Sequence, residues 1–380
     1  MSEKIKLGEL GEIVSGSTPK TNIKEYWNGE ILWITPAEIQ EDDYFISDTK
    51  RKITKLAVEK TNLKLLPKGT VLLSSRAPIG KVAICDNDMY CNQGFKNIIC
   101  SNKLENRYVY YFLKYNVEYI RSIGRGATFK EISKGIVENL EIPYIAKEKQ
   151  IEIANKLDII VRIIKTRKDQ LEQFDKIIKS KFVEMFENEN YTKISLGDIT
   201  NKITDGSHNP PEGIAQNEGY MMLSSQNIIN NSINYKNARF LKKEDYEKED
   251  LRTNLTRGDV LLTIVGTVGR TAIITDETNI ALQRSVAVLK PKKEINSIYL
   301  AGAINSDYVI KQLNKGAKGA AQKGIYLKDI KKIMIPVPPI EQQNQFAKKV
   351  EQINKHKIKL QKSLEEMEEL KESLMNKYFG

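Results

Sequence analysis

One stretch of this chain reads LPKGTVLLS at residues 66–74 and returns as LTRGDVLLT at residues 255–263. In both copies a glycine turn leads into a short apolar run, which is the pattern of a tight turn followed by a buried strand. A second turn and apolar run follow each copy, GKVAI at 80–84 and GRTAII at 269–274. The sequence therefore predicts the same strand–turn–strand unit twice.

The repetition continues on both sides of this stretch. The offset between matching segments drifts only from 189 residues (66 to 255) to 193 residues (126 to 319), so few insertions separate the copies. The other matching pairs are LGEL at 7–10 with LGDI at 196–199, GATFK at 126–130 with GAAQK at 319–323, and Ile142-Pro143 with Ile335-Pro336. A chain of 380 residues is long enough for two domains with their own cores, so we expect two similar mixed α/β units.

Helices are predicted after the strands of each copy. Aromatic residues at helical spacing indicate a helix over 106–120, with a counterpart over 297–313. Each copy then ends in a long helix, over about 147–186 and about 340–378, with an apolar stripe at heptad spacing. The stripe residues are Leu157, Val161, Ile164, Leu171 and Ile178 in the first helix, and Val350, Ile353, Leu360, Leu364, Met367 and Leu374 in the second.

These two long helices are expected to pair. A lone polar helix of this length is not stable in water, so each stripe needs a partner. A helix that leaves the first unit reaches the second, and the other helix must return, which predicts an antiparallel coiled coil with pseudo-twofold symmetry. The alternative is that each helix binds a separate partner. The expected fold class is α/β (α+β), with the two similar mixed α/β units at 1–146 and 191–338 and the long helices as spacers at 147–190 and 339–380.

Composition points to a polyanionic partner. The net charge is +11, and residues 1–146 (21 Lys and Arg, 18 Asp and Glu) and 193–336 (21 and 15) contribute 3 + 6 of it. A lysine-rich composition without such a partner is the alternative. No run of 18 apolar residues and no signal peptide is present, which predicts a cytoplasmic protein away from membranes. Cys85, Cys91 and Cys100 form no CxxC pair and are expected to be buried reduced thiols.

The order of several motifs resembles the specificity subunits of type I restriction-modification systems. The segments that carry the resemblance are VSGSTPK at 14–20, YWNG at 26–29, WITP at 33–36, LSSRAPIGK at 73–81, NQGFK at 92–96, TDGSH at 204–208 and IPVPPIEQQ at 335–343. The second copy lacks the YWNG segment and has QRS at 283–285 where the first has NQG at 92–94. Such divergence is expected if each copy reads a different sequence.

The resemblance implies a non-catalytic subunit that reads double-stranded DNA. Each recognition domain would contact one half of a bipartite target, and the helices would dock two modification subunits. Those subunits would carry S-adenosylmethionine and methylate adenine, whereas this chain would hold no cofactor or metal. Two restriction subunits, where present, would bring ATP and Mg²⁺.

Side-chain chemistry predicts the candidate DNA contacts, because Arg and Lys suit guanine or phosphate, Asn and Gln suit adenine, and Ser and Thr suit phosphate or either base. Any of them is otherwise a loop-stabilising residue. They are Thr18, Lys20, Arg76, Lys81, Gln93 and Lys96 in the first copy, and Ser207, His208, Ser225, Gln226, Asn227, Arg270, Gln283 and Arg284 in the second. Trp27 and Trp33 are expected in the core or at its rim rather than stacked on bases.

Two other classes of function remain as alternatives. A self-contained methyltransferase or nuclease is disfavoured, because Asn209-Pro210-Pro211 is followed by Glu212 instead of the aromatic residue that would close on a flipped base. The glycine-rich segments at 124–126 and 316–319 complete neither a P-loop nor a dinucleotide fingerprint, and are expected to bind phosphate or to form simple turns. A coiled-coil scaffold with incidental basic charge is the other alternative.

Overall fold

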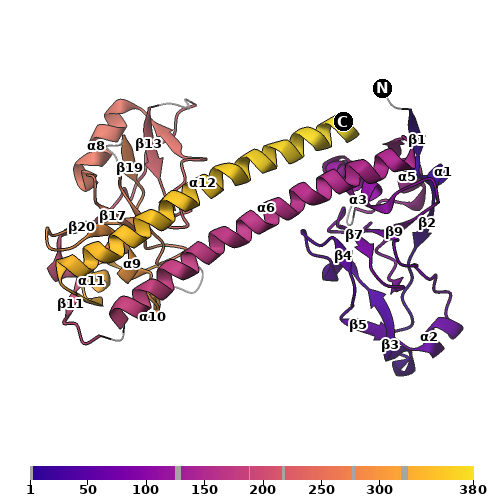
Figure 1. The fold of residues 1–380 in the computed structure, drawn as a ribbon, viewed down its shortest axis with the longest axis horizontal. Helices are drawn as coiled ribbons and strands as arrows, with labels where there is room; N and C mark the ends of the chain where they lie inside the picture. The colour runs from indigo at the N-terminus through magenta and orange to yellow at the C-terminus, as the bar shows by residue number, and fades with distance from the viewer. Residues whose placement is uncertain (1–2, 125–129, 188, 216–218, 276–278, 318–323) are drawn as a thin grey trace. The chain divides into compact units, whose positions relative to one another are not determined.

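The computed structural model describes residues 3–124, 130–187, 189–215, 219–275, 279–317 and 324–380 (Figure 1). Two compact units make up the chain. The first unit comprises Met1–Thr166 with Ser363–Gly380, and the second comprises Arg167–Lys362. Each unit therefore contains one sequence repeat and part of both long helices. Among the described residues, none of the helices is long and apolar enough to cross a membrane.

The first unit is built on a five-stranded sheet in the order β2-β9-β6-β7-β4. Its strands are β2 (Gly11–Ser15), β4 (Phe45–Ile46), β6 (Val71–Leu73), β7 (Val82–Cys85) and β9 (Lys96–Cys100). The turn predicted before β6 needs Gly69, whose φ of +89° is the left-handed conformation that glycine adopts at little cost. All three residues of β6 are buried, as expected for the central strand of a covered sheet.

Smaller elements complete the first unit. A three-stranded sheet contains β3 (Trp27–Ile34), β5 (Arg51–Ile53) and β8 (Tyr90–Cys91), and β1 (Lys4–Lys6) pairs with β10 (Glu141–Pro143). The helices before the long one are α1 (Leu7–Leu10), η1 (Lys24–Tyr26), η2 (Pro36–Glu38), α2 (Lys55–Lys60), α3 (Asn106–Tyr115), α4 (Val117–Ser122) and α5 (Lys134–Glu138).

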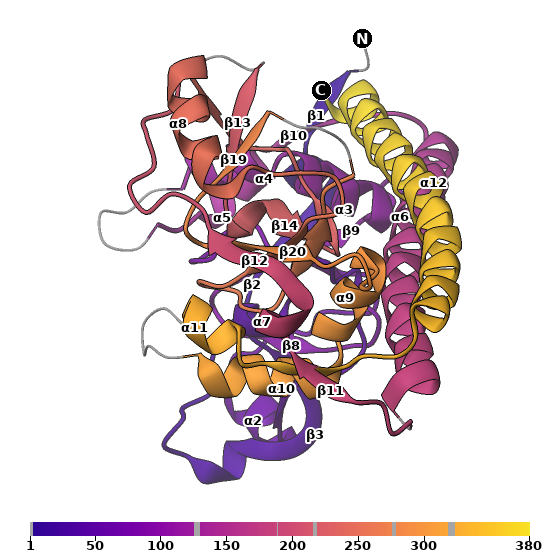
Figure 2. The same cartoon turned by 90° about the vertical axis from the view of Figure 1, so that its left-hand side faces the viewer.

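The second unit repeats this plan. Its main sheet has the order β12-β20-β17-β18, from β12 (Thr200–Asp205), β20 (Val286–Pro291), β17 (Val260–Thr263) and β18 (Thr271–Ile273). The smaller sheets join β16 (Arg239–Leu241), β13 (Tyr220–Leu223) and β19 (Ile280–Leu282), then β14 (Ile228–Ile229) and β15 (Ser232–Ile233), then β11 (Lys193–Ser195) and β21 (Met334–Pro336). Its helices before the last are α7 (Leu196–Ile199), η4 (Ser225–Asn227), α8 (Lys243–Thr253), α9 (Ser297–Ile304), α10 (Asp307–Gly316) and α11 (Leu327–Ile330). Helix α8 lies beside β13 and β19 (Figures 1 and 2). The predicted duplication of a mixed α/β unit is confirmed.

The two long helices are α6 (Lys147–Phe182), which continues into a π-helical turn over Val183–Glu187, and α12 (Ile340–Phe379). Within the second unit they run antiparallel. The rings of Phe186 and Phe346 lie 5.6 Å apart, and further along Lys357 Nζ donates to Asp175 Oδ1 at 2.6 Å. Residue numbers therefore rise along one helix as they fall along the other. The ion pair also gives Lys357, a polar position in the stripe, an acidic partner in the facing helix.

The predicted apolar stripes lie on the covered faces of these helices. Leu157, Ile164, Val350, Leu360 and Leu364 are buried. Val161, Leu171, Ile178, Ile353, Met367 and Leu374 are half-buried. By contrast Ile358, which falls outside the stripe, is 70% exposed.

The predicted helices over 106–120 and 297–313 are wrong in one respect, because each is broken into two. Asn116 separates α3 from α4, and its side-chain amide donates to the Phe112 carbonyl at 2.9 Å. Asn305 likewise donates to the Ala301 carbonyl at 2.9 Å, and Ser306 then caps α10 through the Val309 N–H. Short polar side chains that bond to nearby backbone groups compete with helix continuation and mark new helix starts.

Each unit's core is closed by the end of the long helix that follows the other repeat. In the first unit the Phe379 ring lies 5.0 Å from that of Tyr108. In the second, the Phe186 ring lies 5.0 Å from that of Tyr299. The two tyrosines match: each donates its hydroxyl to the carbonyl of the exit proline, Pro143 or Pro336. The ends of the two helices are therefore core elements as well as spacers.

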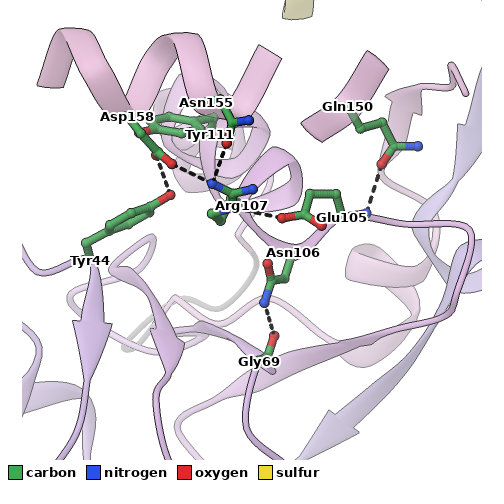
Figure 3. Close-up of polar contacts among 9 residues, drawn as sticks. All are labelled: Tyr44, Gly69, Glu105, Asn106, Arg107, Tyr111, Gln150, Asn155 and Asp158. Atoms are coloured by element: carbon green, nitrogen blue, oxygen red, sulfur yellow. Dashed lines mark hydrogen bonds and ion pairs between the residues drawn. The ribbon is translucent and has the colours of Figure 1, made fainter. Parts of the chain in front are cut away.

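In the first unit a polar network fastens α6 to the sheet and to α3 (Figure 3). Asp158 accepts hydrogen bonds from the hydroxyls of Tyr44 and Tyr111, both at 2.6 Å, and from Arg107 Nη1 at 2.8 Å. Burial, together with these bonds to a carboxylate, raises the pKa of Tyr44 and of Tyr111, so both remain neutral donors.

The second unit uses apolar contacts at the corresponding place. The residues that precede α3 and α9 make matching contacts. Glu105 and Asn296 each donate a backbone N–H at 2.9 Å to a glutamine near the start of a long helix, Gln150 or Gln343. Six residues beyond Asn296, where the first unit has Tyr111, stands Gly302, and a Cβ there would lie 2.8 Å from the Phe346 ring. The glycine is needed because the ring occupies the space.

The cysteines carry no disulfide: Cys85 and Cys91 are buried and Cys100 is half-buried. Burial raises the pKa of Cys91 and of Cys100 to about 12, so both stay protonated thiols at neutral pH. The expectation of reduced thiols holds for all three, and the expectation of full burial fails for Cys100.

Candidate nucleic-acid interface

Two loops meet at the end of the main sheet in each unit, and a glycine lets them approach. In the first unit Ser17 N–H donates to the Cys91 carbonyl at 3.0 Å, and in the second Ser207 N–H donates to that of Leu282 at 2.7 Å. The preceding residues, Gly16 and Gly206, pass so close that an added Cβ would lie 2.0 Å from a backbone carbonyl oxygen. The repeated glycine is therefore required by close packing of backbone.

The loop at 17–20 in the first unit presents two of the predicted residues, Thr18 and Lys20, and a third, Gln93, lies beside it. Thr18 and Gln93 are exposed and joined by a hydrogen bond between their side chains, and Lys20 is exposed nearby in the chain. The structure therefore brings together two predicted residues that lie 75 positions apart in the chain.

Two tryptophans hold this loop from beneath. Trp33 Nε1 donates to the Ser17 carbonyl at 3.2 Å and Trp27 Nε1 to the Lys20 carbonyl at 3.3 Å. Their rings meet edge to face at 5.0 Å, and the Arg51 guanidinium lies 4.1 Å above Trp27. Trp33 is buried and Trp27 half-buried, which confirms the expected core or rim position. Their indole N–H groups fix the loop's backbone.

Arg76 and Lys96 share one carboxylate. Arg76 Nε lies 3.0 Å from Glu131 Oε2, and Lys96 Nζ lies 3.3 Å from Glu131 Oε1. Lys96 is only 8% exposed, so it is held within the protein, whereas Arg76 is exposed. Burial would raise the pKa of Glu131, but the bonds from Arg76 and Lys96 outweigh it and lower that pKa.

Lys81 and Arg270 have matching structural roles. Lys81 Nζ donates to the carbonyls of Pro36 and Ile39, at 3.1 and 2.6 Å, at the end of η2. Arg270 Nη1 donates to the Ile228 carbonyl at 3.4 Å, at the end of η4. A cation at a helix C-terminus satisfies carbonyls that the helix leaves unpaired. Both side chains are therefore occupied in tying the interface loops to the sheet.

The η4 turn orders three more predicted residues. Asn227 is buried; its Oδ1 accepts from Ser224 N–H at 2.9 Å and its Nδ2 donates to the Asn234 carbonyl at 3.0 Å, so it is a framework residue. Ser225 is half-buried and its N–H donates to Ser285 Oγ at 3.0 Å. Gln226 is exposed.

The loop after β12 is fixed differently from its counterpart. His208 Nε2 lies 2.9 Å from Asp205 Oδ2, and Arg252 Nη2 lies 2.5 Å from Asp205 Oδ1. Asp205 is buried, whereas the His208 side chain is 54% exposed. Ser207 is buried, with 6% of its surface exposed.

The remaining predicted residues follow β19. Gln283 is half-buried and its backbone N–H donates to the Leu223 carbonyl, whereas Arg284 is exposed and its backbone N–H donates to the Ser207 carbonyl, both at 2.8 Å. The exposed predicted residues are thus Thr18, Lys20, Arg76 and Gln93 in the first unit, and His208, Gln226, Arg270 and Arg284 in the second. The glycine-rich segments at 124–126 and 316–319, predicted to bind phosphate or to form turns, lie partly outside the described residues, at 125–126 and 318–319.

Sequence reasoning missed the residues that hold this surface. Glu131, Asp205 and Arg252 were not singled out, because each is an ordinary charged residue until the fold places it beside its partner. One signal existed: Asp205 stands where the first repeat has Ser15, directly before the shared glycine.

Comparisons with known proteins show what this chain is similar to. A family model described as the type I restriction modification DNA specificity domain matches residues 2–173 and 188–372. The type I restriction enzyme MjaIX specificity subunit of Methanocaldococcus jannaschii is 40% identical over 232 residues, covering 55% of this chain and 54% of that protein. The chain thus spans about half the length of that relative.

Other matches extend over the whole chain. The MjaVIII specificity subunit of the same organism is 25% identical over 399 aligned positions, covering 98% of this chain and 91% of that protein. Among solved structures, the S subunit of a type I restriction-modification system from M. genitalium has a TM-score of 0.61 at 16% identity, covering 100% of this chain and 96% of that one. The fold is therefore the same along the full length.

Proposed function

Since this chain belongs to the type I restriction-modification DNA specificity family, we propose that it is the DNA-recognition subunit of such a system. The units of residues 1–146 and 191–338 each read one half of a bipartite duplex site, and the helices of 147–190 and 339–380 dock two modification subunits. The chain itself is non-catalytic, and methyl transfer from S-adenosylmethionine takes place on those partners. Where restriction subunits are present, they join through the modification subunits.

One observation carries the proposal: the two units share a framework and differ in the side chains that they expose. Gly16 and Gly206 hold equivalent loops, yet the residue two positions later is Thr18 in one and His208 in the other. Gln93 and Arg284 also occupy matching places. The backbone N–H of the residue before each donates to a carbonyl at the end of a smaller sheet, that of Ile34 or of Leu223. Direct readout of bases depends on side chains at the groove, so units built this way suit two different sequences.

The basic charge of both units supports DNA as the partner. The excess of nine positive charges over residues 1–146 and 193–336 is shared between them, 3 in one and 6 in the other. Contacts to phosphate supply affinity without sequence information, which leaves discrimination to the exposed loop residues.

The test is a map of methylated adenines in cells that carry this chain together with its modification subunit. We expect a two-part motif with a fixed spacer, lost when the gene for this chain is removed. Methylation of a defined motif without this chain would contradict the proposal. Tight binding of S-adenosylmethionine to the purified chain alone would favour a self-contained methyltransferase instead.

A further inference from the structure

Arg76, Lys96 and Glu131, here called the charged trio, form a compact unit at the recognition face of the first unit. Glu131 bridges the two cations, with N–O distances of 3.0 Å to Arg76 and 3.3 Å to Lys96. The three residues differ in exposure, because the Lys96 side chain is 10% exposed and the Arg76 side chain 49%. The buried lysine and the carboxylate therefore lie behind an arginine that faces solvent.

The second unit does without the trio at the same three positions. The backbones of Arg76 and Glu131 form an isolated antiparallel β-bridge. In the second unit the equivalent β-bridge joins Val265 to Gly324. The flanking backbone bonds match as well, Ile132 N–H to the Ser75 carbonyl and Ile325 N–H to that of Ile264, both at 3.0 Å.

Strand register identifies the third position. Lys96 is opposite Ser15 in the first unit, and Ala287 is opposite Asp205 in the second. Valine, alanine and glycine thus replace arginine, lysine and glutamate on an equivalent backbone. The second unit keeps the same backbone without these three residues, so the fold does not require the trio. We therefore look for its role in what the first unit binds.

Charge explains why three residues are needed rather than two. An arginine paired with one carboxylate presents no net charge to an approaching polyanion. Lys96 supplies a second positive charge from the interior, so the trio as a whole carries +1. A buried lysine is costly unless it is paired, and Glu131 pairs with it. The outward guanidinium then keeps its attraction for an electronegative ligand.

Geometry specifies which ligand suits this guanidinium. Glu131 engages Nε, and among the described residues no partner holds the two terminal nitrogens of Arg76. A guanidinium fixed on one edge leaves two parallel donors, which match the O6 and N7 acceptors of guanine in the major groove. The site also adjoins the Thr18–Gln93 pair, because Ser75 N–H donates to the Gly94 carbonyl at 2.7 Å.

We propose that Arg76 reads one guanine of the half-site bound by the first unit, and that Glu131 and Lys96 are positioning residues that aim it and keep its charge. The proposal rests on the proposed function and assigns a specificity determinant within it. The second unit, with Val265 at the matching position, has no such reader there.

The experiment uses the complex of this chain with its modification subunit, and duplexes that carry the mapped site with one base pair changed at a time. For Arg76→Val, the residue that the second unit uses, we expect the preference for one G·C pair to fall by roughly 5- to 100-fold. Preferences across the other half-site stay unchanged and serve as the internal control. Arg76→Lys keeps the charge without the fork, so it should lose most of the same preference.

Positioning is tested by Glu131→Gln and Lys96→Ala. Each should weaken discrimination at the same base pair as Arg76→Val and at no other. In the Arg76→Val background each should add nothing there, since a residue that acts through Arg76 has no further effect once it is gone. A residue with only a structural role would lower affinity for all duplexes alike.

Several results would overturn the proposal. One is that Arg76→Val weakens binding equally to all duplexes and reduces the slope of log affinity against log salt concentration by about one, which marks a phosphate contact. Unchanged base preferences in a folded variant, or a first half-site without a G·C pair, would do so too. If the wild-type complex methylates no defined motif, the proposed function itself has failed, which is a separate outcome. The triple variant with Val, Ala and Gly at these positions, checked by tryptophan fluorescence, shows whether the fold is kept.

Discussion

At Gly16 and Gly206 the absence of a Cβ atom allows two loops of the candidate interface to pack together. Each lies where a Cβ would come 2.0 Å from a backbone carbonyl oxygen, which no rotamer change can relieve. The loop that follows each glycine carries Thr18 or His208, so this backbone contact fixes the position of a side chain that we propose to face DNA. The two tryptophans of the first unit act in the same way, through indole N–H groups directed at loop carbonyls.

Gly16→Ala should therefore destabilise the first unit by about 1–3 kcal/mol, the usual cost of forcing an extra methyl group into packed backbone. Urea unfolding followed by tryptophan fluorescence measures it, because Trp27 and Trp33 are the protein's two tryptophans and both lie in that unit. The control is Gly135→Ala, where nothing lies within 4 Å of the added Cβ and α5 should gain slightly. Equal midpoints for the two variants would contradict the packing argument.

Glu131 gives a pH signature. Its folded pKa is lowered below the ordinary 4.5, so its contribution to stability is present above pH 4.5 and is lost as the pH falls through the folded pKa. Glu131→Gln should thus destabilise the first unit most above pH 4.5, and the difference from wild type should shrink in more acid solution. Fluorescence-detected urea unfolding across this range checks it. A difference that grows on acidification would show that the carboxylate is not held by its two cations.

At the scale of elements, the repeated strands and the long helices followed from the sequence because they depend on local rules. A glycine turn, a short apolar run and a heptad stripe are readable without tertiary contacts. The breaks at Asn116 and Asn305 were missed because helical periodicity continues across them, and only the side-chain bonds reveal the interruption. Nor could sequence identify the charged trio, since Arg76, Lys96 and Glu131 meet only through strand pairing.

The end of α12 yields an element-scale prediction. Phe379 is 3% exposed and packs on Tyr108 of the first unit, although it lies at the far end of the chain. Phe379→Ala should cost about 3–5 kcal/mol and lower the tryptophan-detected unfolding midpoint. Ile358→Ala, at a position 70% exposed on the same helix, should leave that midpoint within about 0.5 kcal/mol. A small effect of Phe379→Ala would mean that the helix end is not part of that core.

At the scale of the whole molecule, we propose that paired helices of 36 and 40 residues set the DNA spacer. Helices of that length extend roughly 54–60 Å, which is comparable with about one and a half turns of duplex. A coiled coil would hold such a distance far better than a flexible linker.

Weakening the apolar stripe should loosen this spacing. Leu360 and Leu364 are buried in the stripe, and changing both to glutamine should cost roughly 2–5 kcal/mol each. Methylation of sites with one base pair more or less in the spacer should then rise relative to the wild-type spacer. The exposed Ile358→Gln variant is the control. An unchanged spacer preference in the double variant would argue against the helices as the ruler.

The most direct test of the central claim, that each unit reads its own half-site, is to exchange residues 1–146 for the matching segment of a relative with a different target. Methylated adenines are then mapped in cells that carry the hybrid and the modification subunit. We predict a motif in which one half is replaced, while the other half keeps its sequence. A motif changed in both halves, or unchanged in both, would contradict the claim.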